Sequence, residues 1–208
     1  MINFKYPDAA VLVFAKAPIS GEVNTRLIRD IGVEAATQLQ VELIGLRLES
    51  LQKNKLCEIE LWCSPDSNHA FFKECKKKYG VTLFSQQGDD LGVRMSLAIK
   101  ESIKRFKRVV LIGTDAPSLT IDQIEIAVQK LADVNDIVIA PAEDGGYVLI
   151  GMSQHCDGVF QSVPWGTDGV LSCTRNNIKA HNLIGAELEL CWDIDRVEDY
   201  QRYKKRAF

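Results

Sequence analysis

Residues 109–117 read Val-Val-Leu-Ile-Gly-Thr-Asp-Ala-Pro, and this stretch decides the fold that we expect. The four apolar residues at its start are typical of a β-strand buried on both faces, as in a parallel sheet. Asp115 follows that strand, and Pro117 turns the chain away. Because ligands of open α/β sheets bind at the carboxyl ends of the strands, the stretch predicts both a sheet type and the place of a site.

Outward from this stretch, strand-like and helix-like runs alternate along the chain. Their order predicts an α/β fold, a three-layer αβα sandwich with a mostly parallel sheet and helices on both faces. No internal repeat, linker or low-complexity stretch interrupts the pattern, so we expect one domain over residues 1–208. Strands are predicted at 9–15, 57–63, 81–85, 109–112, 136–140, 147–151 and 182–190. Helices are predicted at 33–51, 68–79, 91–106, 167–176 and 196–206, and one more follows the capping box that begins at Thr120.

The composition is that of an ordinary globular protein, with 46% apolar and 25% charged residues. A net charge of -3 gives no electrostatic reason to expect nucleic acid or an anionic membrane as a partner. No apolar run is long enough to span a bilayer, and the first residues lack the pattern of a signal peptide, so we expect a cytoplasmic protein. The six cysteines form no C-x-x-C pair, which favours buried free thiols.

The loop from Lys16 to Arg26 follows the first predicted strand and holds two cations, a glycine and several backbone N–H groups. Such a loop can wrap a polyphosphate. A surface loop with solvated charges explains the same residues equally well. The loop matches neither a Walker A motif nor G-x-G-x-x-G.

Two further loops follow predicted strands with glycines and carboxylates. In residues 87–94, Gly88 indicates a turn and Asp89 or Asp90 suits a helix cap, although contact with a base or ribose stays open. In residues 143–147, paired glycines allow close approach to a ligand or form the turn of a hairpin, and both interpretations can hold together.

Asp115 is the principal candidate for a metal ligand, because a carboxylate at this edge can hold Mg²⁺ or Mn²⁺ against diphosphate oxygens. A turn-capping role is the alternative. Asp193 and Asp195 offer a second ligand, with helix capping by Asp195 as an equal alternative. Trp165 could cover an acceptor, although a core or capping role is commoner for such a residue.

Several of these segments together resemble a known family. They are residues 14–18, 21–27, 88–92, 113–117, 141–147, 164–165 and 193–195, in this order. The set resembles the bacterial glycosyltransferase-A-like proteins called radical-SAM/selenodomain-associated transferases, over nearly the whole chain. That family is similar to the molybdenum-cofactor and phospholactate nucleotidyltransferases. The resemblance implies a nucleotide-diphospho-sugar transferase fold, with Lys16 and Arg26 facing phosphates and Asp115 a divalent metal.

One position departs from the family's pattern. The family commonly carries Lys where this chain has Asn24 in Gly-x-Val-x-Thr-Arg-Leu, so a charge that could hold a phosphate is lost. The loss could weaken triphosphate binding, shift the substrate, or mark a protein that binds without turnover.

The first hypothesis is therefore a transferase that uses Mg²⁺ or Mn²⁺, binds a nucleoside triphosphate or nucleotide sugar, and transfers a nucleotidyl or glycosyl group to an unknown acceptor. Nucleotidyl transfer is slightly favoured by the loop 16–26. The alternative is a non-catalytic nucleotide-binding accessory or sensor protein. The expected catalytic residues are Lys16, Arg26 and Asp115, and the expected metal ligands are Asp115, Asp193 and Asp195. Expected nucleotide contacts are Ala15, Lys16, Gly21, Thr25, Arg26, Gly88, Asp90, Gly113 and Thr114, and expected acceptor contacts are Asp144, Gly145, Gly146, Tyr147 and Trp165.

Overall fold

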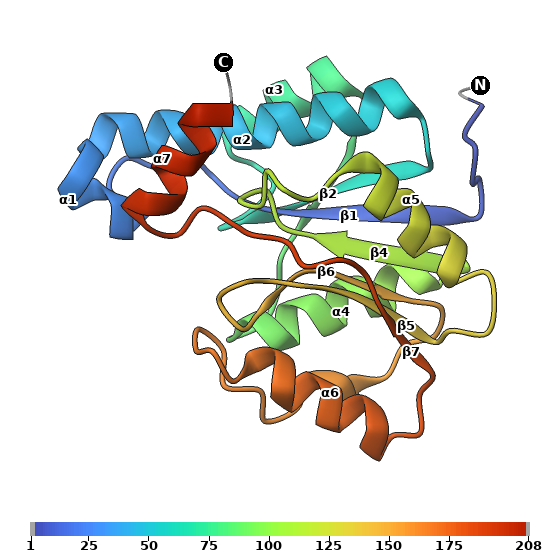
Figure 1. Ribbon diagram of the computed structural model, residues 1–208. Coiled ribbons are helices and arrows are strands. Elements are labelled where there is room, and N and C mark those ends of the chain that lie inside the picture. Colours follow the sequence, from blue (N-terminus) through green and yellow to red (C-terminus); the bar gives the residue numbers. More distant parts are fainter. Residues whose placement is uncertain (1–2, 207–208) are drawn as a thin grey trace.

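The computed structural model describes residues 3–206, the last of them by its backbone alone. Within this range seven strands form one sheet, in the order β3-β2-β1-β4-β6-β5-β7 (Figure 1). The strands are β1 (Ala9–Lys16), β2 (Glu58–Ser64), β3 (Thr82–Ser85), β4 (Arg108–Ile112), β5 (Ile137–Pro141), β6 (Tyr147–Met152) and β7 (Gly185–Glu187). The α-helices are α1 (Ile28–Ile31), α2 (Val33–Asn54), α3 (Ala70–Tyr79), α4 (Leu91–Ile103), α5 (Ile121–Lys130), α6 (Val170–Ala180) and α7 (Val197–Arg206). Two 3₁₀ turns, η1 (Thr25–Leu27) and η2 (Asp157–Phe160), complete the elements.

The sheet is mostly parallel, as the sequence predicts. β1 pairs in parallel with β2 and β4, β2 with β3, and β5 with β7. Only β6 runs the other way, antiparallel to both β4 and β5. The chain adds β2 and β3 on one side of β1 and β4 on the other, so the direction of winding reverses between β1 and β4. In doubly wound sheets a ligand crevice forms at such a point.

Helices cover both faces of the sheet, which confirms the three-layer sandwich. Helices α2, α3 and α5 lie over one face, and α4 and α6 over the other (Figure 1). Alternate residues of β1 enter the two cores: Val11 packs with Ile44 of α2, whereas Leu12 packs with Ile99 of α4. A strand buried on both faces needs apolar residues at every position, which explains the continuous apolar run.

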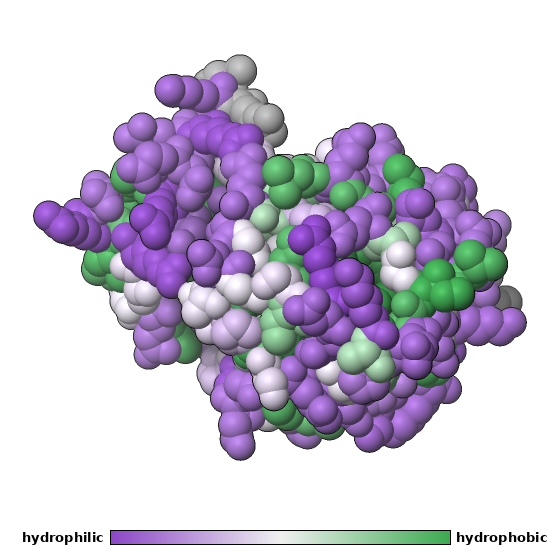
Figure 2. Space-filling view, turned by 60° about the horizontal axis from the view of Figure 1, so that its bottom comes forward, coloured by the Kyte–Doolittle hydropathy of each residue, from purple (hydrophilic) through white to green (hydrophobic). Residues whose placement is uncertain are grey.

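The structure corrects several predicted bounds. β7 covers only three residues of the predicted strand 182–190. Helix α6 begins at Val170 rather than Thr167, because the Thr167 hydroxyl donates to the Pro164 carbonyl and accepts from the Gly169 N–H in a turn. Leu46, an apolar residue of the predicted helix 33–51, lies in α2 but is half exposed. None of the helices in residues 3–206 combines the length and apolar character that crossing a bilayer requires. The face of the molecule shown in Figure 2 is mostly hydrophilic, with small apolar areas between the polar side chains.

Candidate functional site

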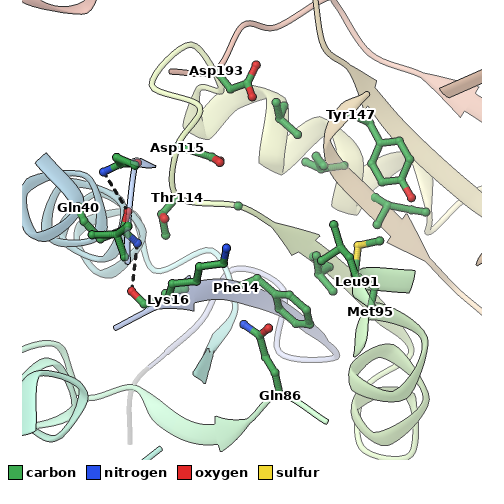
Figure 3. A pocket seen from close by; sticks show the side chains of 18 residues that line it. Phe14, Lys16, Gln40, Gln86, Leu91, Met95, Thr114, Asp115, Tyr147 and Asp193 are labelled. Carbon is green, nitrogen blue, oxygen red and sulfur yellow. Dashed lines mark hydrogen bonds between the residues drawn. The ribbon is translucent and has the colours of Figure 1, made fainter. Parts of the chain in front are cut away.

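A cavity of about 360 Å³ opens at the carboxyl edge of the parallel strands, around the ends of β1 and β4 (Figure 3). Because β6 is antiparallel, its first residues rather than its last reach this edge and form part of the wall. The polar lining residues are Lys16, Asn24, Gln40, Gln86, Thr114, Asp115, Tyr147 and Asp193. The rest of the lining is Phe14, Ala15, Val23, Leu91, Met95, Leu111, Gly113, Val148, Leu149 and Ile150. The cavity is therefore lined by both polar and apolar side chains.

Asp115 lies directly after β4, at the position predicted from residues 109–117. Its side chain is open to the water of the cavity, but protein atoms crowd around it, and this burial raises the pKa of the carboxyl group. A Cβ at position 113 would lie 2.7 Å from Asp115 Oδ1, so only glycine leaves room for the carboxylate in this orientation. The backbone N–H of Ile194 donates to the Asp115 carbonyl over 2.9 Å.

Asp193 faces the same cavity from the segment before α7 (Figure 3). Burial, followed by repulsion from Asp115 and Asp144, raises the pKa of Asp193 to about 7. Within residues 3–206, no three His, Cys, Asp or Glu side chains come together as a ready-made metal site. Asp115 and Asp193 could thus supply two carboxylates, and further oxygens would have to come from a ligand.

Lys16 and Asn24 bring the loop after β1 into the cavity lining. Asn24 has a left-handed backbone with φ 48°, and its Nδ2 donates to the Ala36 carbonyl over 2.9 Å and to Gln40 Oε1 over 3.4 Å. Gln40 Nε2 in turn donates to the Lys16 carbonyl over 3.0 Å. The loop is therefore tied to α2 near both of its ends. Asn24 therefore holds the loop against α2 and also lines the cavity.

Arg26 and Asp195 lie beside the cavity but are not part of its lining. Arg26 Nη1 donates to Asp195 Oδ2 over 2.5 Å, and both side chains are partly exposed. Asp195 does not cap α7 with its side chain. Instead, Asp199 Oδ2 accepts from the N–H groups of Asp195 and Arg196.

The loop before α4 uses its carboxylate for capping. Asp90 Oδ1 accepts from the Val93 N–H over 2.9 Å, so the capping interpretation holds for Asp90. Gly88 has φ 124°, and a Cβ there would lie 2.6 Å from Val93. Gly88 and Asp90 therefore shape the start of α4, outside the lining of the cavity.

The turn between β5 and β6 is the expected hairpin, and its glycine approaches the protein's own backbone. Gly145 has φ 88°, and a Cβ there would lie 2.4 Å from the Asp168 carbonyl oxygen. Tyr147 lines the cavity, and Trp165 meets its ring edge-on with centroids 6.3 Å apart. Trp165 also packs on Gly92, where a Cβ would lie 2.7 Å from the indole.

The structure thus brings part of the predicted site together. Seven of the predicted residues line the cavity: Ala15, Lys16, Gly113, Thr114, Asp115, Tyr147 and Asp193. The others lie outside its lining: Gly21, Thr25, Arg26, Gly88, Asp90, Asp144, Gly145, Gly146, Trp165 and Asp195. Sequence reasoning missed Gln40 and Gln86. Gln40 does leave a signal, since a polar residue one helical turn from Ala36 and from Ile44 falls on the buried face of α2.

Solved structures with the same architecture define the fold as that of the nucleotide-diphospho-sugar transferases. A protein from Desulfovibrio desulfuricans G20, provisionally named a nucleotide-diphospho-sugar transferase, is 30% identical with a TM-score of 0.83, over 92% of this chain and 84% of that one. A cytidylyltransferase from Leptospira borgpetersenii is 18% identical with a TM-score of 0.64, over 98% and 88%. Glucosyl-3-phosphoglycerate synthase from Mycobacterium tuberculosis, solved with Mn²⁺, UDP and phosphoglyceric acid, is 11% identical with a TM-score of 0.53, over 96% and 75%.

The chain belongs to the family described as "Uncharacterized protein conserved in bacteria (DUF2064)", whose sequence profile matches residues 47–167. The matched region contains Asp115 and the β5–β6 hairpin, while the loop after β1 and Asp193 lie outside it. No curated protein sequence matches the chain.

Proposed function

We propose that this protein is a transferase that binds a nucleoside triphosphate or a nucleotide sugar in the cavity, together with Mg²⁺ or Mn²⁺. The observation that carries the proposal is the cavity itself. One amine, from Lys16, and two carboxylates, from Asp115 and Asp193, face it at the winding reversal between β1 and β4. A divalent cation and a polyphosphate together complement this mixture of charges.

The residues present fit a divalent metal. Asp115 and Asp193 are hard oxygen donors of the kind that Mg²⁺ prefers. Burial, together with repulsion from neighbouring carboxylates, raises the pKa of both groups, and a bound cation would oppose that effect. When bound, the cation supplies positive charge to the diphosphate. Lys16 would hold phosphate oxygens, and Gly113 leaves the room that the Asp115 carboxylate needs. The second-ligand role of Asp195 stays a prediction, since that carboxylate is paired with Arg26.

Nucleotidyl transfer is favoured over glycosyl transfer, because the loop from Lys16 to Arg26 resembles the phosphate loop of nucleotidyltransferases. The fold is shared with both kinds of enzyme, so it does not choose between them. The acceptor would enter on the β6 side, where Tyr147 lines the cavity and Asp144, Gly145, Gly146 and Trp165 lie close by. The narrower relation to radical-SAM/selenodomain-associated transferases, the single-domain organisation and a cytoplasmic location are parts of the same proposal.

One observation favours a second candidate, a nucleotide-binding accessory protein without turnover. Lys16 is the one Lys or Arg among the described lining residues, because position 24 is Asn and Arg26 is paired with Asp195. A triphosphate carries more negative charge than this single amine offsets. Tight binding without a product is the outcome that would support this candidate.

The test is a thermal-shift panel of nucleoside triphosphates and nucleotide sugars, with and without Mn²⁺. It compares the wild type with Asp115→Asn and with Asp133→Asn, an exposed carboxylate in the turn after α5. A ligand at 100 times its Kd adds about 2.7 kcal/mol of stability, or several degrees for a domain of this size. We expect a Mn²⁺-dependent shift in the wild type and in Asp133→Asn that Asp115→Asn loses.

The product then separates the reactions. Release of pyrophosphate from the stabilising triphosphate would identify nucleotidyl transfer, and release of a nucleoside diphosphate from a sugar donor would identify glycosyl transfer. If no nucleotide stabilises the wild type with or without Mn²⁺, the donor site is wrong.

A further inference from the structure

Arg47 is a buried cation of α2 that the candidate site, as described so far, does not use. Its exposed fraction is only 7%, and it lies under the turn that follows Asp115. Nη1 donates to the Leu119 carbonyl over 2.8 Å, and Nη2 donates to the Ala116 carbonyl over 2.7 Å. The planar guanidinium thus spans residues 116–119 like a fork, a geometry that a lysine amine does not reproduce.

Burying this charge is costly, so its partners are informative. Burial lowers the pKa of Arg47 to about 10, an effect that nearby Asp115 and Cys191 partly offset, and the side chain stays charged at neutral pH. No carboxylate in residues 3–206 forms an ion pair with it, and Nε finds no acceptor there. The charge is therefore held by two backbone carbonyls. A desolvated cation with such partners makes strong hydrogen bonds that fix the carbonyls in place.

The same turn is bonded onward to the segment that carries Asp193. The Ser118 hydroxyl donates to the Trp192 carbonyl over 2.5 Å and accepts from the Trp192 N–H over 2.7 Å. Two residues later, the Ile194 N–H donates to the Asp115 carbonyl over 2.9 Å. Asp193 lies between these two attachments. A single row of hydrogen bonds thus connects α2, the turn after β4 and the backbone on both sides of Asp193.

We propose that Arg47 is a positioning residue, which holds the turn 116–119 and, through Ser118, sets the position of Asp193 relative to Asp115. The inference rests on the proposed function in one respect, namely that these two carboxylates share a ligand. The fork orders the 116–119 turn, the turn orders the backbone at Trp192 and Ile194, and that backbone aims the second carboxylate into the cavity. Arg47 itself touches no substrate.

The experiment compares Arg47→Met, Arg47→Lys and Ser118→Ala with the wild type. The matched control is Arg108→Met, at the opposite end of β4. Arg108 is also largely buried and donates to a backbone carbonyl, that of Val128, but it lies far from the turn. The first readout is amide hydrogen exchange at Trp192 and Ile194 in the protein without metal or nucleotide. The second is Mn²⁺ binding by electron paramagnetic resonance, with and without the stabilising nucleotide.

We expect Arg47→Met and Ser118→Ala to speed exchange at Trp192 and Ile194 and to weaken Mn²⁺ binding by about tenfold or more, as loss of a group that orients a metal ligand does. Arg47→Lys should fall between Arg47→Met and the wild type. Arg108→Met should change neither readout, even if it lowers Tm. Arg47→Lys keeps a cation at this position, so it keeps the test available if Arg47→Met does not fold, while Ser118→Ala shows how much exchange at Trp192 depends on the Ser118 hydroxyl alone.

The two ideas can fail separately. If exchange at Trp192 and Ile194 is the same in folded Arg47→Lys, Ser118→Ala and wild type, the positioning role is wrong whatever the metal does. If the wild type binds no Mn²⁺ with any nucleotide, the metal part of the proposed function is wrong, while faster exchange confined to these amides would still support the positioning role.

Discussion

The backbone N–H of Ile194 donates to the backbone carbonyl of Asp115 over 2.9 Å, and this bond joins two segments that are distant in the sequence. It places the carboxylates of Asp115 and Asp193 at one edge of the sheet, where repulsion from Asp115 adds to burial in raising the pKa of Asp193. The chain keeps two carboxyl groups close together, and this arrangement has measurable consequences.

The first consequence concerns the pH dependence of stability without metal. The pKa of Asp193 is about 7 in the folded protein, above its ordinary value. A group with a raised folded pKa contributes stability that is fully present at low pH and is lost as pH rises through the folded pKa. We therefore expect Asp193→Asn to raise Tm by a few degrees at pH 8 and by clearly less at pH 5, which lies between the ordinary and the folded pKa of this group. Thermal melts in a chelator at both pH values check this. Equal effects at the two pH values would show that Asp193 does not titrate in this range.

A second prediction concerns Lys16. If its amine holds a phosphate, Lys16→Met removes a charge-assisted hydrogen bond that is worth about 1.5–3 kcal/mol. Nucleotide affinity should then fall by about tenfold to a hundredfold, which calorimetric titration would measure. The control is Lys53→Met, whose exposed amine on α2 pairs with Glu49 and should leave affinity unchanged. Equal affinity in Lys16→Met and wild type would show that the phosphates do not bind at Lys16.

A third prediction concerns the loop conformation at Asn24. Asn24→Ala loses the hydrogen bond to the Ala36 carbonyl and places alanine at φ 48°, so we expect a loss of about 1–2 kcal/mol in the free energy of unfolding. Asn24→Gly loses the bond but accepts the left-handed backbone, and it should cost about half as much. Urea unfolding measures both values. A glycine variant as unstable as the alanine variant would mean that backbone strain does not matter here.

A fourth prediction tests the packing of Trp165. A methyl group at position 92 would lie 2.7 Å from the indole, so Gly92→Ala should lower stability by about 1–3 kcal/mol through overpacking. Trp165→Leu removes the ring, and the double variant should therefore be more stable than the sum of the two single losses predicts. Denaturant melts of the four proteins complete the cycle. Additive losses would place the indole away from Gly92 in solution.

Much of the fold could be predicted from the sequence, because its central strands are buried on both faces and its helices begin and end at recognisable capping residues. The capping box at Thr120–Gln123 is present as predicted, and Gly80 ends α3 in the left-handed conformation. The length of the edge strand β7 is smaller than the sequence predicts. Its residues are largely exposed, so they carry little of the apolar pattern from which strands are predicted.

The candidate site was less predictable, because hydrogen bonds between distant segments decide which side chains reach the cavity. Arg26 and Asp195 each look like a ligand residue in the sequence, but they pair with each other. Arg47 lies between the apolar residues of α2, and its partners Ala116 and Leu119 are backbone carbonyls. Every residue has a backbone carbonyl, so the sequence does not indicate which carbonyls accept a hydrogen bond from Arg47. Only the structure shows this contact.

The reversed strand β6 has an effect on which parts of the cavity can change. It is paired with β4 on one side and β5 on the other, so Leu149 and Ile150 of the cavity wall are anchored on both sides, whereas Val148 falls at the register shift opposite β5. The loop after β1 is held to α2 by side-chain hydrogen bonds of Asn24 and Gln40 and not by strand pairing on two sides. A change of substrate during evolution would therefore alter the loops and leave the β6 wall unchanged. Relatives of this protein should differ most in structure where the chain leaves the sheet.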